Sequence, residues 1–266
     1  MFISSTQNPK IKHLLALQQK SSLRRKEGLF VVEGQRELGH CLGAGYEIDS
    51  IFMLEDTPLE ELQINEGCET YTVSANVYSR IAYRESTEGV TAILKAKQLR
   101  LQDLDESIKQ KPETASHPPL YVVIEGVEKP GNIGAILRSA DAAGIDAVIV
   151  CDPLTDIYNP NLIRSSIGAV FTVPVVACTS EECIAFLKEH HVQILTAQLQ
   201  DSSPYYATDM RRPTAIVMGT EATGLTPIWR KAADAHIRIP MLGQLDSLNV
   251  SVSAAILMYE AVRQRN

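Results

Sequence analysis

Short runs of apolar residues recur along the second half of the chain, and segments with helical spacing separate most of them. The runs do not alternate with polar residues, which is typical of strands buried on both faces of a sheet. The expected strands are 121–124, 147–150, 171–175, 193–196 and 215–218, and the expected helices are 132–143, 159–168, 181–190 and 226–233. Strands alternating with helices predict right-handed crossovers and an α/β fold with a mostly parallel sheet.

The first half of the chain mixes both kinds of element at shorter spacing. Helices are expected over 8–20 and about 35–44, and strands at 29–32, 50–54, 69–73 and 89–94. The stretch 98–119 ends in a polar, proline-punctuated sequence that cannot continue a helix or a central strand. It has the composition of an inter-domain linker. We therefore predict a small α/β domain at 1–97, a linker at 98–119 and a second domain at 120–266.

Composition narrows the class of protein. Hydrophobic residues make up 45% of the 266 residues, enough to bury a sizeable core. No apolar run approaches the ~18 residues of a membrane span, and the first residues do not resemble an export signal. Five scattered cysteines without a Cys-x-x-Cys pair indicate neither a disulfide scaffold nor a tetrahedral zinc site. We expect a cytoplasmic protein without a membrane segment or a metal.

The charge is unevenly distributed. The net charge is −7, yet residues 1–40 carry seven Lys and Arg against three Glu. A basic patch on an acidic protein is either a phosphate-binding footprint or a solvated helix with a basic end. Charge alone leaves both interpretations open.

Three segments follow predicted strands, where parallel sheets collect ligands. In the first, Gly131, Asn132 and Gly134 form a turn that lets the backbone approach a ligand, and Asn132 is suited to cap the next helix. Arg138 follows among small apolar residues, so its guanidinium must reach a rim, a ligand or a partner. A dinucleotide fingerprint does not fit, because Gly-x-Gly-x-x-Gly spacing is absent. A purely structural turn stays possible.

The other two segments lie further along the chain. In 218–227, Gly219 and Gly224 bracket a loop with Glu221 near its centre, which by itself is weak support for a site. In 237–265, a short strand at 237–240 precedes a long helix expected to begin near Leu248, with Asp246 or Ser247 as its cap. The polar side chains at this helix start either bind a ligand or form hydrogen bonds with each other, and this segment alone leaves both interpretations open.

Taken together, the three segments resemble the SpoU (TrmH-like) family of RNA ribose 2′-O-methyltransferases, within the SPOUT class. Residues 132–141 look like its motif 1, 218–225 like motif 2 and 239–251 like motif 3, in the family's order and spacing. Residues 4–34 are similar, more loosely, to the RNA substrate-binding domain of many members, whose fold is like that of ribosomal proteins that bind kinked RNA. Two departures stand out. Ala222 and Thr223 follow Glu221 where Gly-x-Gly is common, and Glu-Lys-Pro-Gly-Asn at 128–132 stands where the family often has Asp-Pro-x-Asn.

The resemblance implies a deep trefoil knot at the C-terminus, S-adenosyl-L-methionine as methyl donor and a homodimer. By family position, the polar site residues are Asn132, Arg138, Glu221, Ser247 and Asn249. The donor is expected against Gly219, Ile239 and Leu248, with Thr196, Glu221 and Met241 nearby. In the N-terminal domain we expect phosphate contacts from Lys10, Lys12, Arg24, Arg25 and Lys26.

The expected reaction is methylation of a ribose 2′-hydroxyl, in large-subunit rRNA because of the extra N-terminal domain. An arginine is a poor base, so we expect Arg138 to clamp the phosphate of the target nucleotide. The alternatives are a tRNA substrate and an RNA-binding protein with a decayed site. A nicotinamide-dependent oxidoreductase lacks both the glycine spacing and a clear ribose-binding acid.

Overall fold

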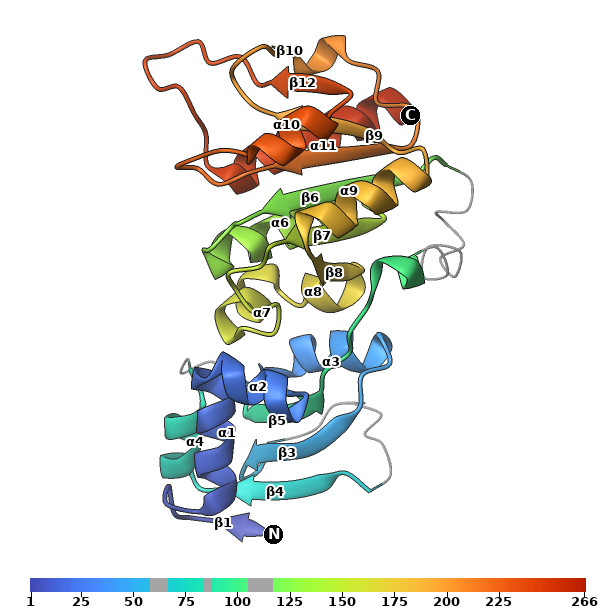
Figure 1. The fold of residues 1–266 in the computed structure, drawn as a ribbon. Helices are drawn as coiled ribbons and strands as arrows, with labels where there is room; N and C mark the ends of the chain where they lie inside the picture. The colour runs from blue at the N-terminus through green and yellow to red at the C-terminus, as the bar shows by residue number, and fades with distance from the viewer. Residues whose placement is uncertain (58–66, 84–87, 105–116) are drawn as a thin grey trace. The chain divides into compact units, whose positions relative to one another are not determined.

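The computed structural model describes residues 1–57, 67–83, 88–104 and 117–266 (Figure 1). The chain forms two compact units. Unit 1 comprises residues 1–97 together with 156–172, and unit 2 comprises 98–155 and 173–266. Among the described residues, no helix is both long and apolar enough to span a membrane.

Unit 1 is built on a five-stranded mixed sheet in the order β1-β4-β3-β5-β2. Its strands are β1 (Phe2–Ile3), β2 (Leu29–Glu33), β3 (Ile48–Leu54), β4 (Glu69–Val73) and β5 (Val90–Lys95). Its helices are α1 (Pro9–Gln19), α2 (Ser21–Glu27), α3 (Gln35–Gly43), α4 (Ala75–Ile81), α7 (Pro160–Ser166) and α8 (Ala169–Thr172). Ile11, Leu14 and Leu17 of α1 are fully buried, as their spacing predicts, and pack with Phe52 and Tyr71 of the sheet.

The segment 156–172 belongs to unit 1 although it follows the predicted linker. The Asp156 carboxylate accepts a hydrogen bond from Nε of Arg24 at 2.6 Å, and both side chains are nearly inaccessible to solvent. Tyr158 stacks on Phe30, with ring centroids 4.3 Å apart, and its hydroxyl donates to the Lys97 carbonyl. A buried ion pair and an aromatic stack therefore fasten this excursion of the chain to the N-terminal sheet.

Unit 2 is a seven-stranded sheet in the order β10-β12-β9-β11-β6-β7-β8, with every pairing parallel. Its strands are β6 (Leu120–Glu125), β7 (Ala147–Cys151), β8 (Val175–Cys178), β9 (Gln193–Ala197), β10 (Ser203–Pro204), β11 (Thr214–Met218) and β12 (Ala235–Arg238). Its helices are α6 (Pro130–Ala142), α9 (Ser180–Glu189), α10 (Pro227–Ala232) and α11 (Val250–Arg265) (Figure 1). The mostly parallel α/β fold is confirmed.

Three local predictions are wrong. Residues 171–175 are not one strand: α8 ends at Thr172, and β8 begins only at Val175, after Pro174. Helix α6 begins at Pro130 with Lys129 as its N-cap, so Asn132 lies inside the first turn. Helix α11 is capped by Asn249, not by Asp246 or Ser247, because the Asn249 side chain accepts from the Ser251 amide. Elements not predicted include β1, α2, α4 and β10.

The predicted linker is partly structured. Leu101 and Leu104 are buried in the core of unit 2, beside a short 3-10 turn at Leu101–Asp103. Residues 105–116 lie outside the described residues. The first part of the predicted linker therefore belongs to unit 2 by its packing.

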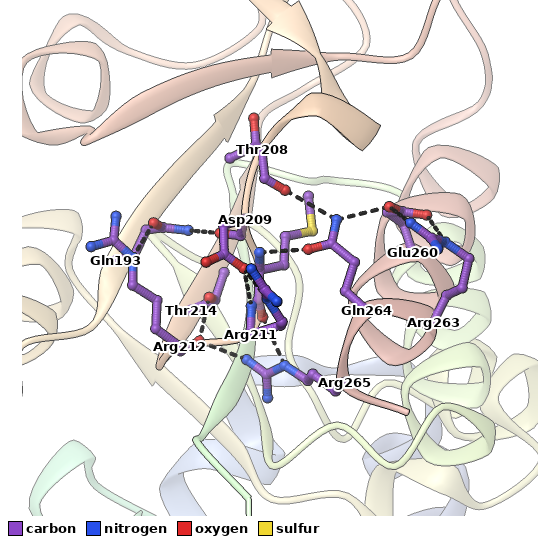
Figure 2. A network of polar contacts seen from close by, with 11 residues as sticks. Gln193, Thr208, Asp209, Arg211, Arg212, Thr214, Glu260, Arg263, Gln264 and Arg265 are labelled. Carbon is purple, nitrogen blue, oxygen red and sulfur yellow. Dashed lines mark hydrogen bonds and ion pairs between the residues drawn. The ribbon is translucent and has the colours of Figure 1, made fainter.

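Helix α11 runs back along β11. At its C-terminal end, Gln264 accepts from the Met210 amide at 2.8 Å and donates to the Thr208 carbonyl at 3.0 Å. Arg265 donates to the Met210 and Arg212 carbonyls, so the last turn is fixed to the segment that leads into β11 (Figure 2). Since its other end meets the loop that leaves β11, this network sets where the helix start lies.

Candidate active site

The three motif segments meet at one carboxylate. Oε1 of Glu221 accepts from Nδ2 of Asn132 at 3.2 Å, from Nδ2 of Asn249 at 2.9 Å and from the Val250 amide at 3.4 Å. Nδ2 of Asn249 also lies 3.2 Å from Oδ1 of Asn132, which closes a triangle of polar side chains. The structure therefore joins the loop after β11 to the first turn of α6 and the start of α11.

Asn249 has two tasks at this point. Its Nδ2 donates to Glu221, while its Oδ1 accepts from the amide and the hydroxyl of Ser251. The helix cap and the polar triangle thus use opposite ends of one side-chain amide. A substitution of Asn249 would disturb the start of α11 and the triangle together.

The triangle carries a negative charge. The Val250 amide, which donates to the carboxylate, and the nearby Lys129 ammonium hold the pKa of Glu221 below its usual range, so the side chain is ionised near neutral pH. Nζ of Lys129 lies 3.6 Å from Oε2 of Glu221. The Glu221 side chain stays 38% exposed, so the carboxylate is open to solvent or to a ligand.

The loop after β11 is closed tightly on itself. A Cβ placed on Gly219 would lie 2.3 Å from the carbonyl carbon and oxygen of Gly224, so only glycine fits there. Gly224 itself has a φ of +68°, in the left-handed region that favours glycine. Ala222 does not have a positive φ, so the departure from Gly-x-Gly introduces no backbone strain.

Glu125 fixes the far end of this loop. It is buried at the carboxyl end of β6, and its carboxylate accepts from the Thr226 amide at 2.8 Å and from the Thr226 hydroxyl at 2.6 Å. Ser180 of α9 donates to the same carboxylate at 3.2 Å. Glu125 was not predicted from the sequence, although an acidic residue ending an apolar strand run was the available signal. Lys129, which lies within the segment that carries motif 1, was not predicted either.

The residues expected to hold the methyl donor follow three adjacent strands. Thr196 lies in β9, Gly219 follows β11, and Ile239 and Met241 follow β12, and these strands are neighbours in the order β12-β9-β11. Thr196 is fully buried and its hydroxyl lies 2.6 Å from Nδ1 of His236. Leu248 immediately precedes the Asn249 cap and is 39% exposed.

The segment between β12 and α11 is loosely held. Leu242 is 98% exposed and Leu245 is 80% exposed. Within the described part of the chain, residues 240–248 make no hydrogen bond to any other residue. Their backbone amides and carbonyls, together with exposed leucine side chains, are the groups that a nucleoside with an apolar ring face requires.

Two predicted site residues are not joined to the triangle. Arg138 is exposed on α6, and its guanidinium has no partner among the residues that the structure describes. It lies six residues after Asn132, which turns it about 120° around the helix axis. Ser247 is also exposed and has no partner in the described chain. Within one chain, the triangle consists of Asn132, Glu221 and Asn249 alone.

The predicted phosphate contacts of unit 1 divide into two groups. Lys12, Arg25 and Lys26 are exposed and have no partner among the described side chains, while Lys10 is half-exposed and pairs with Glu69 at 2.7 Å. The predicted phosphate contact of Arg24 is wrong. It is only 4% exposed and its guanidinium is occupied by Asp156 and by two carbonyls of α1, so it is not available to a phosphate.

Comparison with known proteins relates both halves of the chain to one group of enzymes. Residues 119–259 match the SpoU rRNA Methylase family, and residues 8–92 match the MRM3-like substrate binding domain. The chain is 29% identical to a 23S rRNA (guanosine(2553)-2′-O)-methyltransferase of Bacillus subtilis, over 97% of each chain. It is 36% identical to a 23S rRNA (guanosine-2′-O-)-methyltransferase of Bordetella pertussis, over 75% of this chain and 80% of that one.

Solved structures agree with these sequence relationships. An AdoMet-bound rRNA methyltransferase from Sinorhizobium meliloti superposes with a TM-score of 0.88 at 28% identity, over 99% of this chain and 97% of the other. The SpoU methyltransferase AviRb from Streptomyces viridochromogenes, in complex with AdoMet, superposes with a TM-score of 0.85 at 27% identity, over 97% and 99% of the two chains. The chain belongs to the SpoU rRNA methylase family.

Proposed function

We propose that the chain transfers a methyl group from S-adenosyl-L-methionine to a ribose 2′-hydroxyl of large-subunit rRNA. The observation that carries this proposal is the meeting of Asn132, Glu221 and Asn249 at the carboxyl ends of the parallel strands. The relatives named as 23S rRNA methyltransferases, which span nearly the whole chain or most of it, support the choice of substrate.

The residues present fit the methyl donor. In the Gly219–Gly224 loop, the backbone at Gly219 lies so close to the backbone of Gly224 that no side chain fits between them. Residues 240–248 offer amides and carbonyls that no other described residue uses. The residues that hold the donor are Thr196, Gly219, Glu221, Ile239, Met241 and Leu248. Bound there, it supplies a methyl group on a sulfonium, which needs no metal to activate it.

The chain's own residues align the acceptor. An in-line displacement requires the hydroxyl oxygen, the methyl carbon and the sulfur in one line, and alignment of this kind contributes up to about 7–11 kcal/mol. Glu221, Asn132 and Asn249 hold the loops rigid, because each hydrogen bond of the triangle joins two segments far apart in the sequence. A guanidinium holds phosphate through a planar fork, so Arg138 clamps the target nucleotide, and Ser247 orients its ribose.

A homodimer completes this site. Arg138 is exposed and unpartnered in the described part of one chain, and it is not joined to the triangle of its own chain. In a two-fold dimer each protomer can present Arg138 to the site of its partner. The loops after β9, β11 and β12 form the trefoil knot of the family. The rRNA substrate implies a cytoplasmic location.

Methyl transfer to purified RNA tests the proposal. The full chain is incubated with labelled S-adenosyl-L-methionine and either 23S-type rRNA or tRNA, and the RNA is then digested to nucleosides. We expect label in one 2′-O-methylribose nucleoside of the rRNA. Label in tRNA alone would show that the substrate is tRNA and not rRNA. Failure to bind the methyl donor in calorimetry would favour an RNA-binding protein with a decayed site.

The basic surface of unit 1 carries a prediction of its own. Replacing Lys12, Arg25 and Lys26 with Gln removes three exposed cations that no described residue pairs. Each phosphate contact contributes about one unit to the slope of log K against log salt, so we expect weaker RNA binding and a slope shallower by about two to three. Fluorescence anisotropy at several salt concentrations measures both quantities.

A matched variant controls for overall charge. Lys95, Lys188 and Arg211 are also exposed, and their replacement with Gln changes the net charge by the same amount at other places. We expect this control to keep the wild-type slope. Equal slopes for wild type and both variants would show that Lys12, Arg25 and Lys26 do not contact RNA phosphates.

A further inference from the structure

Three of the five cysteines gather at one end of unit 2. Cys151 ends β7 and Cys178 ends β8, and the two are register partners in adjacent parallel strands. Cys183 lies in the first half of α9, the helix that follows β8. The three Sγ atoms all lie within 4.8 Å of one another. Cys151 and Cys178 are 27 residues apart in the sequence and Cys178 and Cys183 are five apart, yet the fold brings all three into one cluster.

The spacing of the sulfur atoms suits a metal ion. A Zn²⁺ bound at about 2.3 Å by thiolates in tetrahedral geometry separates its sulfur ligands by about 3.8 Å. Sulfur atoms within 4.8 Å of one another approach this arrangement with side-chain movements of under about 1 Å. A disulfide would use only two of the three thiols. A metal ion uses all three, because each sulfur occupies one position of the tetrahedron.

The surroundings of the cluster favour a thiophilic cation with one open position. Cys151 and Cys183 are fully buried and belong to the apolar core of unit 2. Cys178 is only partly buried, which leaves a solvent-facing side. Asp152 follows Cys151 directly, and its carboxylate accepts from the Ser180 hydroxyl at 2.6 Å, so a carboxylate lies at the start of the helix that carries Cys183.

We propose that Cys151, Cys178 and Cys183 bind one Zn²⁺ through three thiolates, with a water or a neighbouring carboxylate at the fourth position. Binding converts thiols into thiolates, and the protons they lose pass to the solvent. Sheet order places the cluster toward the β8 edge, whereas the Glu221 loop follows β11. The site is therefore distinct from the polar triangle, and its assignment does not rest on the proposed methyl transfer.

Such an ion would anchor the edge of the sheet. It links β8, the edge strand, to β7 and to the helix that covers them. The hydroxyl of Ser180, at the start of the same helix, lies 2.6 Å from a carboxylate oxygen of Asp152 and 3.2 Å from one of Glu125. Because Glu125 holds Thr226, a firmly placed α9 also steadies the end of the Gly219–Thr226 loop.

Titration of the reduced, metal-free full chain with Co²⁺ tests the site. We expect thiolate-to-cobalt charge-transfer bands and the visible bands of tetrahedral Co²⁺, saturating at one equivalent and abolished by Zn²⁺. We also expect Zn²⁺ to raise the melting temperature, because a ligand that binds only the folded state stabilises it. Calorimetry in buffers of different ionisation enthalpy measures the released protons.

Cysteine variants make the assignment specific. Cys178→Ser removes one partly buried sulfur and should weaken Co²⁺ binding at least about 100-fold, the upper end of what second-shell changes cost. Cys68→Ser, in unit 1, is the matched control and should bind as the wild type does. Absence of the charge-transfer bands in the wild type, or equal affinity of Cys178→Ser and wild type, would overturn the proposal. Neither result depends on methyl transfer.

Discussion

Replacing Arg138 with Ala should lower the rate of methyl transfer about 10²–10³-fold while the affinity for S-adenosyl-L-methionine stays within a few-fold of wild type. The rate falls because a positioned cation that meets the reacting nucleotide is lost, and single donors of this kind are worth that much. The affinity is kept because Arg138 has no partner in the described chain and is not joined to the Glu221 loop. Single-turnover assays and calorimetry measure the two quantities.

Arg138→Lys separates charge from shape. Lysine keeps the positive charge but lacks the planar fork that holds phosphate through two parallel hydrogen bonds. We therefore expect a rate between those of wild type and Arg138→Ala. If cofactor affinity fell as far as the rate does in Arg138→Ala, Arg138 would belong to the cofactor site and the phosphate clamp would be wrong.

Mixing two inactive variants tells which protomer supplies the arginine. In a mixed dimer of Arg138→Ala and Glu221→Ala chains, contribution across the interface leaves one site with both residues intact. Random exchange of subunits would then restore about a quarter of wild-type activity, since half of the dimers are mixed and each has one intact site. Contribution within one chain predicts no recovery.

The sequence pattern predicts the strands of unit 2 well because they are buried on both faces. The runs at 121–124 and 215–218 became the central pair β6 and β11, each one to two residues longer than expected. The run at 171–175 misled because a short apolar run does not distinguish a strand from a buried helical turn. There, Phe171 packs on Phe30 and Tyr46 from a helix, and Pro174 separates it from β8.

Local sequence patterns did not predict the contacts between distant parts of the chain. Several cap-forming residues precede α11, and the pattern favoured Asp246 or Ser247, whereas Asn249 is the cap that also donates to Glu221. Arg24 counts as a surface cation by charge, and only its pairing with Asp156, 132 residues away, shows that it is buried. The cysteine cluster was hidden for the same reason, since strand order brings its members together.

Replacing Glu221 with Ala should have an effect as large as the loss of Arg138, and on both substrates. The Nδ2 atoms of Asn132 and Asn249 and the Val250 amide would lose their shared acceptor, so motifs 1, 2 and 3 would no longer be held in register. A misplacement of about 1 Å costs roughly 10²-fold in rate. We expect that loss in kcat/KM and weaker binding of S-adenosyl-L-methionine, measured by initial rates and calorimetry.

Glu221→Gln distinguishes geometry from charge. The three hydrogen bonds that Glu221 accepts from Asn132, Asn249 and the Val250 amide all end on Oε1, and a glutamine oxygen at that place accepts them as the carboxylate does. Only the charge and the contact of Oε2 with Lys129 are lost. We therefore expect Glu221→Gln to keep most of the activity, with Lys129→Gln as the control that removes the same ion pair from the other side. If Gln lost as much as Ala while Lys129→Gln stayed active, the carboxylate's charge would itself act on substrate or donor, and a purely structural triangle would be wrong.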